Sequence, residues 1–379
     1  MSKLILSEEE TMLADSARGF LDEAAPVTHL RKMRDAGEIH DAKLWREMAQ
    51  MGWTGILIPE EAGGSDMGHA AAGVLAGELG KTLVSSPFLS TAVIAATALR
   101  HVGDARSMAA LTAIAEGQVT YALALDEGKK FAPDATAMKA TREGNGFRLN
   151  GKKTFVVDGG LADRMLVLAR TDDGMTLFDI PSDREGIARS AQNMIDARDA
   201  ARVEFNNVEA TGDDVLGTVD DAMTVLRPAI EAGQAALAAE MTGLASGAFG
   251  MTVGYLKERK QFGRAIGSFQ GLQHRAAELF AELELARSIV LQGLQAIQTG
   301  LDHQRDQRGK AAATVHLDLE AVLMPEVDQP LHGVEDLLPL LFEYGKCKQN
   351  GKTGRDPTNV PNPSLFEIDG GMSSATGTL

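Results

Sequence analysis

The amino-acid sequence predicts an α+β chain of several domains, in which a β-rich domain lies between two helical ones. Three observations indicate this order. Apolar residues recur at helical spacing in the first segment, short alternating runs broken by turn residues fill the middle, and helical spacing then returns. The length of 379 residues allows two or three domains. We therefore expect an N-terminal α domain over 1–118, a middle β domain over 119–219 and a C-terminal helical domain over 220–379.

The first segment carries signals for several helices. Ser7 followed by Glu10 is a capping box at the start of the first helix, and Pro26 ends that helix. Asp41 can cap a second helix, which stops at Gly52. A short apolar run with a glycine-rich turn follows at 51–68, and further helical segments are expected at 69–83 and 90–101. These signals predict one α-helical domain.

The middle segment consists of short apolar or alternating runs. Turn residues such as Asn145-Gly146 and Asn150-Gly151 separate them. Regular short strands of this kind are typical of a small β-barrel or sandwich. The expected strands cover 119–125, 137–142, 146–149, 153–157, 164–169, 175–180 and 202–205.

Two long helices are expected after residue 220, over 222–257 and 268–301. The break between them falls at Gly263 and Gly267, and Ser268 is a plausible N-cap for the second helix. The turn concentrates cationic and amide side chains, namely Arg259, Lys260, Gln261, Arg264, Gln270, Gln273, His274 and Arg275. An arginine fork, amides and a helix N-terminus suit a pyrophosphate and an adenine. On these residues alone, a solvated turn between helices is an open alternative.

Charge and composition argue against several kinds of partner. The net charge of -16 disfavours nucleic acid or an anionic membrane, so a polyanionic ligand would need a local basic site. No apolar run approaches membrane-spanning length. Cys347 is the only cysteine, which excludes an intrachain disulfide, and the histidines show no metal-ligand spacing. The N-terminus resembles neither a signal peptide nor a transit peptide, so we expect a cytoplasmic protein. The histidine spacing predicts that the protein has no metal site.

Three motifs resemble those of a known family. The segment Arg259-Lys-Gln-Phe-Gly-Arg-Ala-Ile-Gly-Ser-Phe-Gln-Gly-Leu-Gln-His274 resembles the signature of the acyl-CoA dehydrogenase family. Gly52-Trp-Thr-Gly-Ile-Leu-Ile-Pro-Glu-Glu-Ala-Gly-Gly64 resembles a second landmark, and Phe147-Arg-Leu-Asn-Gly-Lys-Lys153 is similar to the middle domain. The resemblance covers residues 1–300 and implies a C-terminal helical bundle. The tail 345–379, rich in Gly, Lys, Asn, Pro and Thr, is atypical of the family.

The resemblance implies a flavoprotein of lipid catabolism. Such an enzyme oxidises the Cα–Cβ bond of an acyl-CoA thioester to the 2-enoyl-CoA, with hydride transfer to flavin N5, and FAD is obligatory. The implied partners are an acyl-CoA substrate, an electron-transfer flavoprotein, and further subunits in a homodimer, homotetramer or heteromer. The implied contacts to the adenosine diphosphate half of FAD are Arg259, Gln261, Phe262 and Gln270, with Gln329 and Gly333 nearer the C-terminus.

Positions around the isoalloxazine depart from the family pattern. Trp-Ile-Thr-Asn becomes Phe155-Val-Val-Asp158, and Thr-Glu-Pro becomes Leu125-Asp-Glu127. The Phe155 ring can still stack on the flavin, but Val157 lacks the hydroxyl that would hydrogen-bond to it. The loop Gly-x-Gly-Ser-Asp is replaced by Gly128-Lys-Lys-Phe-Ala-Pro-Asp134. We expect flavin contacts from Phe155 and Leu125 at this end.

The catalytic base should be a carboxylate in a dry pocket. The resemblance places it either in the helix before residue 259 or in the C-terminal segment. Glu231 is our candidate, although the family position falls on Gly233, and Glu240 and Glu367 are alternatives. A chain with no base is also open, as a non-catalytic subunit that supplies scaffold and flavin contacts to a heteromer. A flavin oxidase or monooxygenase of the same fold is a further alternative.

Overall fold

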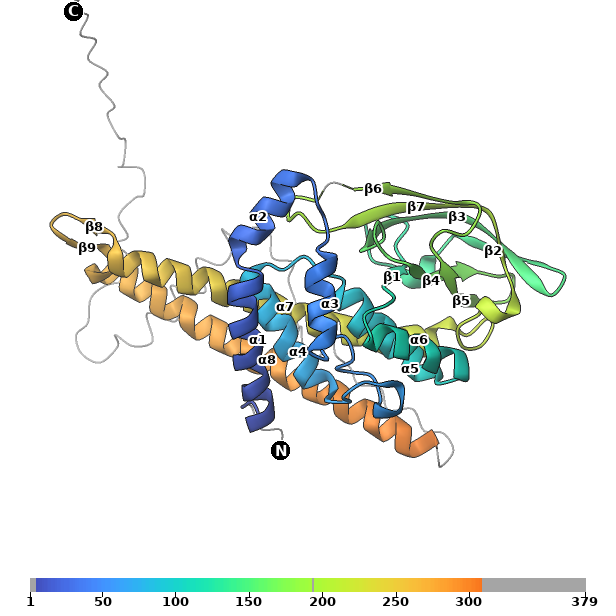
Figure 1. The fold of residues 1–379 in the computed structure, drawn as a ribbon, viewed down its shortest axis with the longest axis horizontal. Helices are drawn as coiled ribbons and strands as arrows, with labels where there is room; N and C mark the ends of the chain where they lie inside the picture. The colour runs from blue at the N-terminus through green and yellow to red at the C-terminus, as the bar shows by residue number, and fades with distance from the viewer. Residues whose placement is uncertain (1–4, 193, 309–379) are drawn as a thin grey trace, which may run out of the picture. The chain divides into compact units, whose positions relative to one another are not determined.

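The structure, a computed structural model, describes residues 5–192 and 194–308 and is shown in Figure 1. In this part of the chain, helices precede and follow a curled mixed sheet, which confirms the predicted fold class. The boundaries proposed for the three domains stay predictions. Gln329, Gly333 and Glu367 lie outside the described residues.

The helices before the sheet follow the capping signals of the sequence. The Ser7 hydroxyl accepts the Glu10 N–H at 3.1 Å, the Glu10 carboxylate accepts the Ser7 N–H at 2.7 Å, and Asp41 caps its helix through the N–H of Lys43. Pro26 does more than end the first helix, because it is also the N-cap residue of the next one. The elements are α1 (Glu8–Ala24), α2 (Val27–Ala36), α3 (Ala42–Gln50), α4 (Gly68–Thr82), a π-helix (Phe88–Ala95), α5 (Ala96–Val102) and α6 (Ala105–Ala115).

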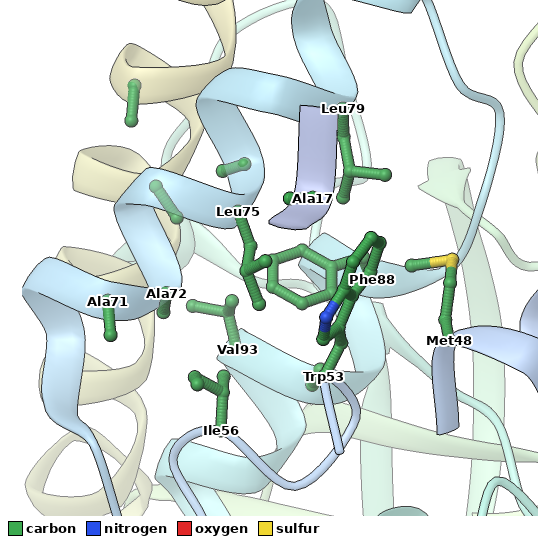
Figure 2. Close-up of a cluster of buried hydrophobic side chains, with 14 of the residues drawn as sticks. Ala17, Met48, Trp53, Ile56, Ala71, Ala72, Leu75, Leu79, Phe88 and Val93 are labelled. Atoms are coloured by element: carbon green, nitrogen blue, oxygen red, sulfur yellow. The ribbon is translucent and has the colours of Figure 1, made fainter. Parts of the chain in front are cut away.

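One apolar core joins α1, α3, α4 and the π-helix to the first long helix after the sheet. Figure 2 shows Trp53 between Leu75 and Phe88, with Met48 beside it. The Phe20 ring meets Trp53 edge to face, with ring centroids 5.4 Å apart. Buried alanines of α7 (Ala222–Glu258) complete the same core. The N-terminal helices are therefore held against a C-terminal helix by shared burial of apolar side chains.

The sheet contains β1 (Tyr121–Ala124), β2 (Lys139–Glu143), β3 (Gly146–Val157), β4 (Arg164–Arg170), β5 (Met175–Pro181), β6 (Ile187–Ala191) and β7 (Ala200–Ala210). Its order is β1-β4-β2-β3-β7-β6, and β5 pairs with β4. The β1–β4 and β2–β4 pairs are parallel and the others antiparallel. Its hydrophobic face includes Phe147 and Phe178, whose rings meet edge to face at 5.2 Å.

Two strand predictions were wrong. The runs 146–149 and 153–157 form one strand, β3. The strand continues through Asn150-Gly151 because its pairing with β7 shifts in register there. Gly151 has φ +150°, which a residue with a side chain rarely adopts. Strand β6 was not expected, because its side chains are almost all exposed and show no apolar alternation.

The chain ends its described part with a helical hairpin formed by α7 and α8 (Gln270–Arg308). Between these helices lie the two-residue strands β8 (Lys260–Gln261) and β9 (Arg264–Ala265). Phe262 and Gly263 form their turn with φ +53° and +76°, as a tight hairpin requires. The prediction that Ser268 is an N-cap was wrong. Its hydroxyl donates to the Ala265 carbonyl at 2.7 Å within a 3₁₀ turn, and α8 begins at Gln270.

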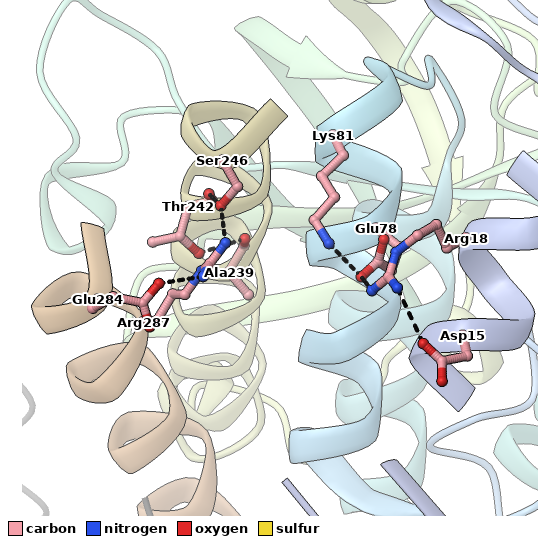
Figure 3. A network of polar contacts seen from close by, with 9 residues as sticks. All are labelled: Asp15, Arg18, Glu78, Lys81, Ala239, Thr242, Ser246, Glu284 and Arg287. Carbon is pink, nitrogen blue, oxygen red and sulfur yellow. Dashed lines mark hydrogen bonds and ion pairs between the residues drawn. The ribbon is translucent and has the colours of Figure 1, made fainter. Parts of the chain in front are cut away.

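Polar contacts lock the long helices together on one side. Arg287 of α8 donates to the Ser246 hydroxyl of α7 at 2.7 Å, as Figure 3 shows. On the neighbouring helices, the buried Glu78 carboxylate of α4 accepts from Arg18 of α1 at 3.2 Å and from Lys81 at 2.6 Å. These contacts hold α1 against α4 and α7 against α8, and the β8–β9 turn connects the last two helices.

Candidate active site

An aromatic side chain stands out from the sheet at an irregularity in β3. Phe155 lies where the register against β7 shifts between Lys153 and Val156, and its φ is +57°. The next residue, Val156, is 1% exposed, yet Phe155 is 49% exposed. Its N–H donates to the Gln192 side-chain oxygen at 2.7 Å instead of to a neighbouring strand. A bulge of this kind re-aims a side chain, here toward solvent, where a planar ligand could stack on the ring.

Phe155 borders an open cavity of about 670 Å³. This volume lies within the range of small-molecule sites. The cavity is formed by the segment after β1 together with β3 and β7. Its lining residues are Asp126, Glu127, Gly128, Lys129, Lys130, Phe131, Lys152, Thr154, Phe155, Arg202 and Glu204.

A buried ion pair fixes one wall of this cavity. The fully buried Lys153 ammonium donates to the Glu127 carboxylate at 2.7 Å, to the Thr136 hydroxyl at 2.8 Å and to the Leu125 carbonyl at 3.1 Å. Burial alone would raise the pKa of Glu127. Hydrogen bonds from Lys153, Thr136 and the N–H groups of 137 and 138 outweigh burial and lower that pKa to about 2. Glu127 is therefore an ionised anchor rather than a proton carrier at neutral pH.

Leu125 contributes little exposed surface here. Its side chain is 6% exposed and packs in the core beneath the sheet, while its carbonyl accepts the Lys153 ammonium. The flavin contact expected of Leu125 stays a prediction.

A buried carboxyl, that of Asp158, lies just beyond Phe155. The Ser90 hydroxyl donates to Asp158. Burial, helped by the nearby Asp199, raises the pKa of Asp158 to about 7 against the opposing effect of that hydrogen bond. No periodic or spacing signal in the sequence predicts this group. Its one distinguishing feature in the sequence is that Asp158 stands where the family motif has Asn.

The residues of the β8–β9 turn that are predicted to contact FAD lie close together in the chain and are exposed to solvent. Phe262 is 92% exposed and its ring meets that of Phe269 edge to face at 6.2 Å. The Gln261 amide donates to the Lys260 carbonyl at 2.8 Å. The four residues proposed for this turn, all exposed, are Arg259, Gln261, Phe262 and Gln270.

One chain does not bring the two halves of the predicted site together. Figure 1 draws the β8–β9 turn at the end of the α7–α8 hairpin away from the sheet that carries Phe155. The turn and the cavity beside Phe155 are therefore separate surfaces of the described chain.

The candidate bases on α7 differ in their surroundings. Glu231 is half-buried. The Glu240 carboxylate forms an ion pair with Arg198, and its side chain is only 12% exposed. Gly233 packs so tightly that a Cβ there would lie 2.7 Å from Ile94. The helix thus has no room for a side chain at 233 unless Ile94 moves.

Within residues 5–192 and 194–308, no helix has the length and apolar character of a membrane span. No group of three or more His, Cys, Asp or Glu there is arranged to hold a metal ion.

Comparison with known proteins finds three family models that match successive parts of the chain. The family models "Acyl-CoA dehydrogenase, N-terminal domain", "middle domain" and "C-terminal domain" match residues 7–118, 122–208 and 222–317. The acyl-CoA dehydrogenase IpdE2 of Mycobacterium tuberculosis is 32% identical over 290 residues, which are 76% of each chain.

Two solved structures have the same fold. A variant of the Tcur3481-Tcur3483 steroid ACAD is 33% identical with a TM-score of 0.71, over 77% of this chain and 79% of that one. The ChsE4-ChsE5 complex from Mycobacterium tuberculosis is 25% identical with a TM-score of 0.72, over 80% and 81%.

Proposed function

Because the chain belongs to the acyl-CoA dehydrogenase family, we propose that it oxidises the Cα–Cβ bond of an acyl-CoA thioester to the 2-enoyl-CoA. Members of the family are FAD-binding oxidoreductases that act on CH–CH bonds, in agreement with the class of enzyme and the cofactor expected from the sequence. The observation that carries the proposal is the half-exposed Phe155 ring at the wall of the cavity, at the motif position that addresses the flavin.

The described residues fit FAD at both of its ends. Phe155 offers a ring face to the isoalloxazine, and the exposed Arg259 and Gln261 offer donors to the pyrophosphate and adenine. When bound, FAD supplies the acceptor for the hydride that leaves the β-carbon of the substrate. Val157 has no hydroxyl, so this chain would hold the ring with one side-chain donor fewer than the family motif offers.

Separation of the two ends within one chain favours an oligomer. We assign the Arg259 turn of one subunit to the cofactor that stacks on Phe155 of another. A symmetric pair of subunits would then form two equivalent sites.

Glu231 is the proposed base for the α-proton. It lies half-buried on α7, two positions before Gly233. Proton transfer by a positioned carboxylate contributes roughly 10²–10⁴-fold to a rate.

Glu231→Gln should therefore retain FAD and lose anaerobic flavin reduction by acyl-CoA by about 100-fold or more, because the amide cannot accept the α-proton. Stopped-flow absorbance measures the loss. Glu240→Gln is the control and should still be reduced. Reduction of Glu231→Gln at the rate of the unmodified chain would move the base elsewhere.

Turnover tests the reaction itself. The purified protein is incubated with a panel of acyl-CoAs and an artificial electron acceptor, and the CoA product is identified by mass spectrometry. A product with two hydrogens fewer than its substrate supports the proposal, and electron-transfer flavoprotein, the proposed physiological acceptor, should replace the dye. Oxygen consumption without the acceptor would instead identify an oxidase.

A non-catalytic subunit is a second candidate. Val157 lacks the flavin-facing hydroxyl, and Ile94 occupies the space that a side chain at 233 would need. In addition, the chain resembles a protein solved as the ChsE4-ChsE5 complex. Flavin content separates the two candidates, because a scaffold subunit expressed alone should purify without FAD and gain it only with its partner.

A further inference from the structure

Asp126 contributes a carboxylate to the cavity beside Phe155. It lies in the segment after β1, is half-buried and lines the cavity. Its backbone carbonyl accepts the Thr154 N–H at 2.7 Å, which ties it to the residue before Phe155 on β3. Asp126 is therefore fixed to the strand that carries the ring on which we propose that the flavin stacks.

The carboxylate of Asp126 has no hydrogen-bond or ion-pair partner in the described part of the chain. Its neighbour Glu127 instead takes the buried Lys153 ammonium, the Thr136 hydroxyl and two backbone N–H groups. Burial raises the pKa of Asp126, and the charge of Lys153 opposes that effect. Two adjacent carboxylates thus differ, because the protein satisfies one and leaves the other to a ligand.

The remaining charges of the cavity are exposed to solvent, and no cation among them forms a salt bridge with a described carboxylate. They are Lys129, Lys130, Lys152, Arg202 and Glu204. Water and salt screen exposed charges, whereas a half-buried charge acts through a medium of lower dielectric constant. Among the described lining charges without a partner, Asp126 is therefore the one that solvent screens least.

The flavin ring has a group that matches this carboxylate. The oxidised isoalloxazine carries one N–H donor, at N3, between two carbonyl oxygens. A carboxylate accepts from such a donor, whereas it repels carbonyl oxygens and phosphates. A negative charge beside the ring also opposes the gain of electrons, and charges and hydrogen bonds at the ring nitrogens are means by which a protein tunes its cofactor.

We propose that the Asp126 carboxylate accepts the N3–H of the flavin that stacks on Phe155 and lowers the reduction potential of that flavin. The inference rests on the proposed function, since it takes FAD as the cofactor in this cavity. It adds a charged contact to a segment from which the sequence predicted only Leu125 to meet the flavin.

The test measures the reduction potential of the FAD-loaded protein, with xanthine and xanthine oxidase as the reductant and a dye of known potential as the reference. It is made at about pH 8, above the range in which a carboxyl group ordinarily titrates. Asp126→Asn keeps the shape of the side chain and removes its charge. We expect the equilibrium with the dye to shift toward reduced flavin by about tenfold or more, which is about 30 mV for a two-electron couple.

Two further variants separate this charge from other effects. Asp126→Glu keeps the charge and should stay close to the unmodified chain. Glu204→Gln is the matched control, because Glu204 lines the same cavity but is exposed, and it should raise the potential less than Asp126→Asn does. Equal potentials of Asp126→Asn and the unmodified chain would overturn the proposal. An equal rise in Asp126→Asn and Glu204→Gln would also overturn it, because the flavin would then respond to net charge alone.

Failure of the proposed function looks different. An unmodified chain that takes up no FAD would contradict the cofactor site itself, and this inference with it. A chain that binds FAD, but with a potential that does not depend on Asp126, would overturn only the role of this residue.

Discussion

Asp158 combines a buried carboxyl, a left-handed backbone conformation and a hydrogen bond from the Ser90 hydroxyl. Its φ is +58°, a conformation that Asn and Asp tolerate better than most residues. The carboxyl is enclosed, with Ser90 as its hydrogen-bond donor and Asp199 nearby. Because burial raises its pKa to about 7, the folded chain keeps this proton over a pH range in which the unfolded chain has lost it.

A pH-dependent stability follows from this difference. Between about pH 4, the ordinary carboxyl pKa, and pH 7, the native state binds more protons at Asp158 than the unfolded state does. Stability from this group is therefore complete at low pH and falls as pH rises to 7.

Asp158→Asn removes the titrating group while keeping the shape and tolerance of the left-handed backbone. We expect the variant to exceed the unmodified chain in free energy of unfolding at pH 8, by on the order of 1–2 kcal/mol, with the difference shrinking toward pH 5. Urea unfolding at the two pH values measures it. An equal effect at both pH values would show that Asp158 is ionised throughout.

Sequence reasoning at this scale succeeded for side chains with a local signature and failed for those set by packing. The capping contacts of Ser7 and Asp41 depend on neighbours within three residues, so the sequence shows them directly. The outward position of Phe155 depends on a register shift against β7, and the engagement of Glu240 on a partner 42 positions away. Neither can be seen in a periodic pattern.

At the scale of elements, close contact between α4 and α7 depends on glycine. A Cβ on Gly243 would lie 1.9 Å from the Gly77 carbonyl oxygen, so the two backbones approach more closely than any larger residue allows. This contact packs α7, the helix that contains Glu231, against α4 of the N-terminal core.

Gly243→Ala should destabilise the chain by about 1–3 kcal/mol, because the added methyl group must push the helices apart. Gly250→Ala on the same helix is the control. Apart from the helix's own nearby backbone, no atom lies within 4 Å of its Cβ position, so higher helix propensity should raise stability by roughly 0.5–1 kcal/mol. Thermal or urea unfolding compares them. Equal effects of the two substitutions would contradict a glycine-dependent helix contact.

Element prediction failed where the signal was weak or shared. Helix α6 was not expected, although its N-cap Asp104, whose side chain accepts the Ser107 N–H at 2.7 Å, is a capping signal in the sequence. Strand β6 offered no signal, because Arg189 and its neighbours are exposed. Two long helices and the order of helices and strands were predictable, since their periodic patterns extend over many residues.

At the scale of the whole molecule, the proposed cofactor site needs two chains. The sequence identified the Arg259 turn and the Phe155 strand as parts of one site through the family resemblance. It could not show that they occupy separate surfaces of a single chain, because distance in space is not encoded in either motif.

Subunit complementation tests this arrangement. Arg259→Ala and Phe155→Ala should each lower FAD occupancy as homo-oligomers, because every site lacks one contact. A mixed dimer of the two, isolated through two different affinity tags, should bind about one FAD, because one of its two sites has both native residues. Flavin absorbance after gel filtration measures the recovery. A mixed dimer as poor in FAD as its parents would place both residues at sites within one chain.

We propose, above all, that this chain binds FAD and uses it to oxidise an acyl-CoA. The most direct measurement is the visible absorbance of the purified protein during anaerobic addition of acyl-CoAs of different length and branching. A self-sufficient dehydrogenase should show flavin bands that bleach with at least one of them. A protein that stays colourless after incubation with FAD, or whose flavin bands are unmoved by every acyl-CoA tested, would contradict the claim.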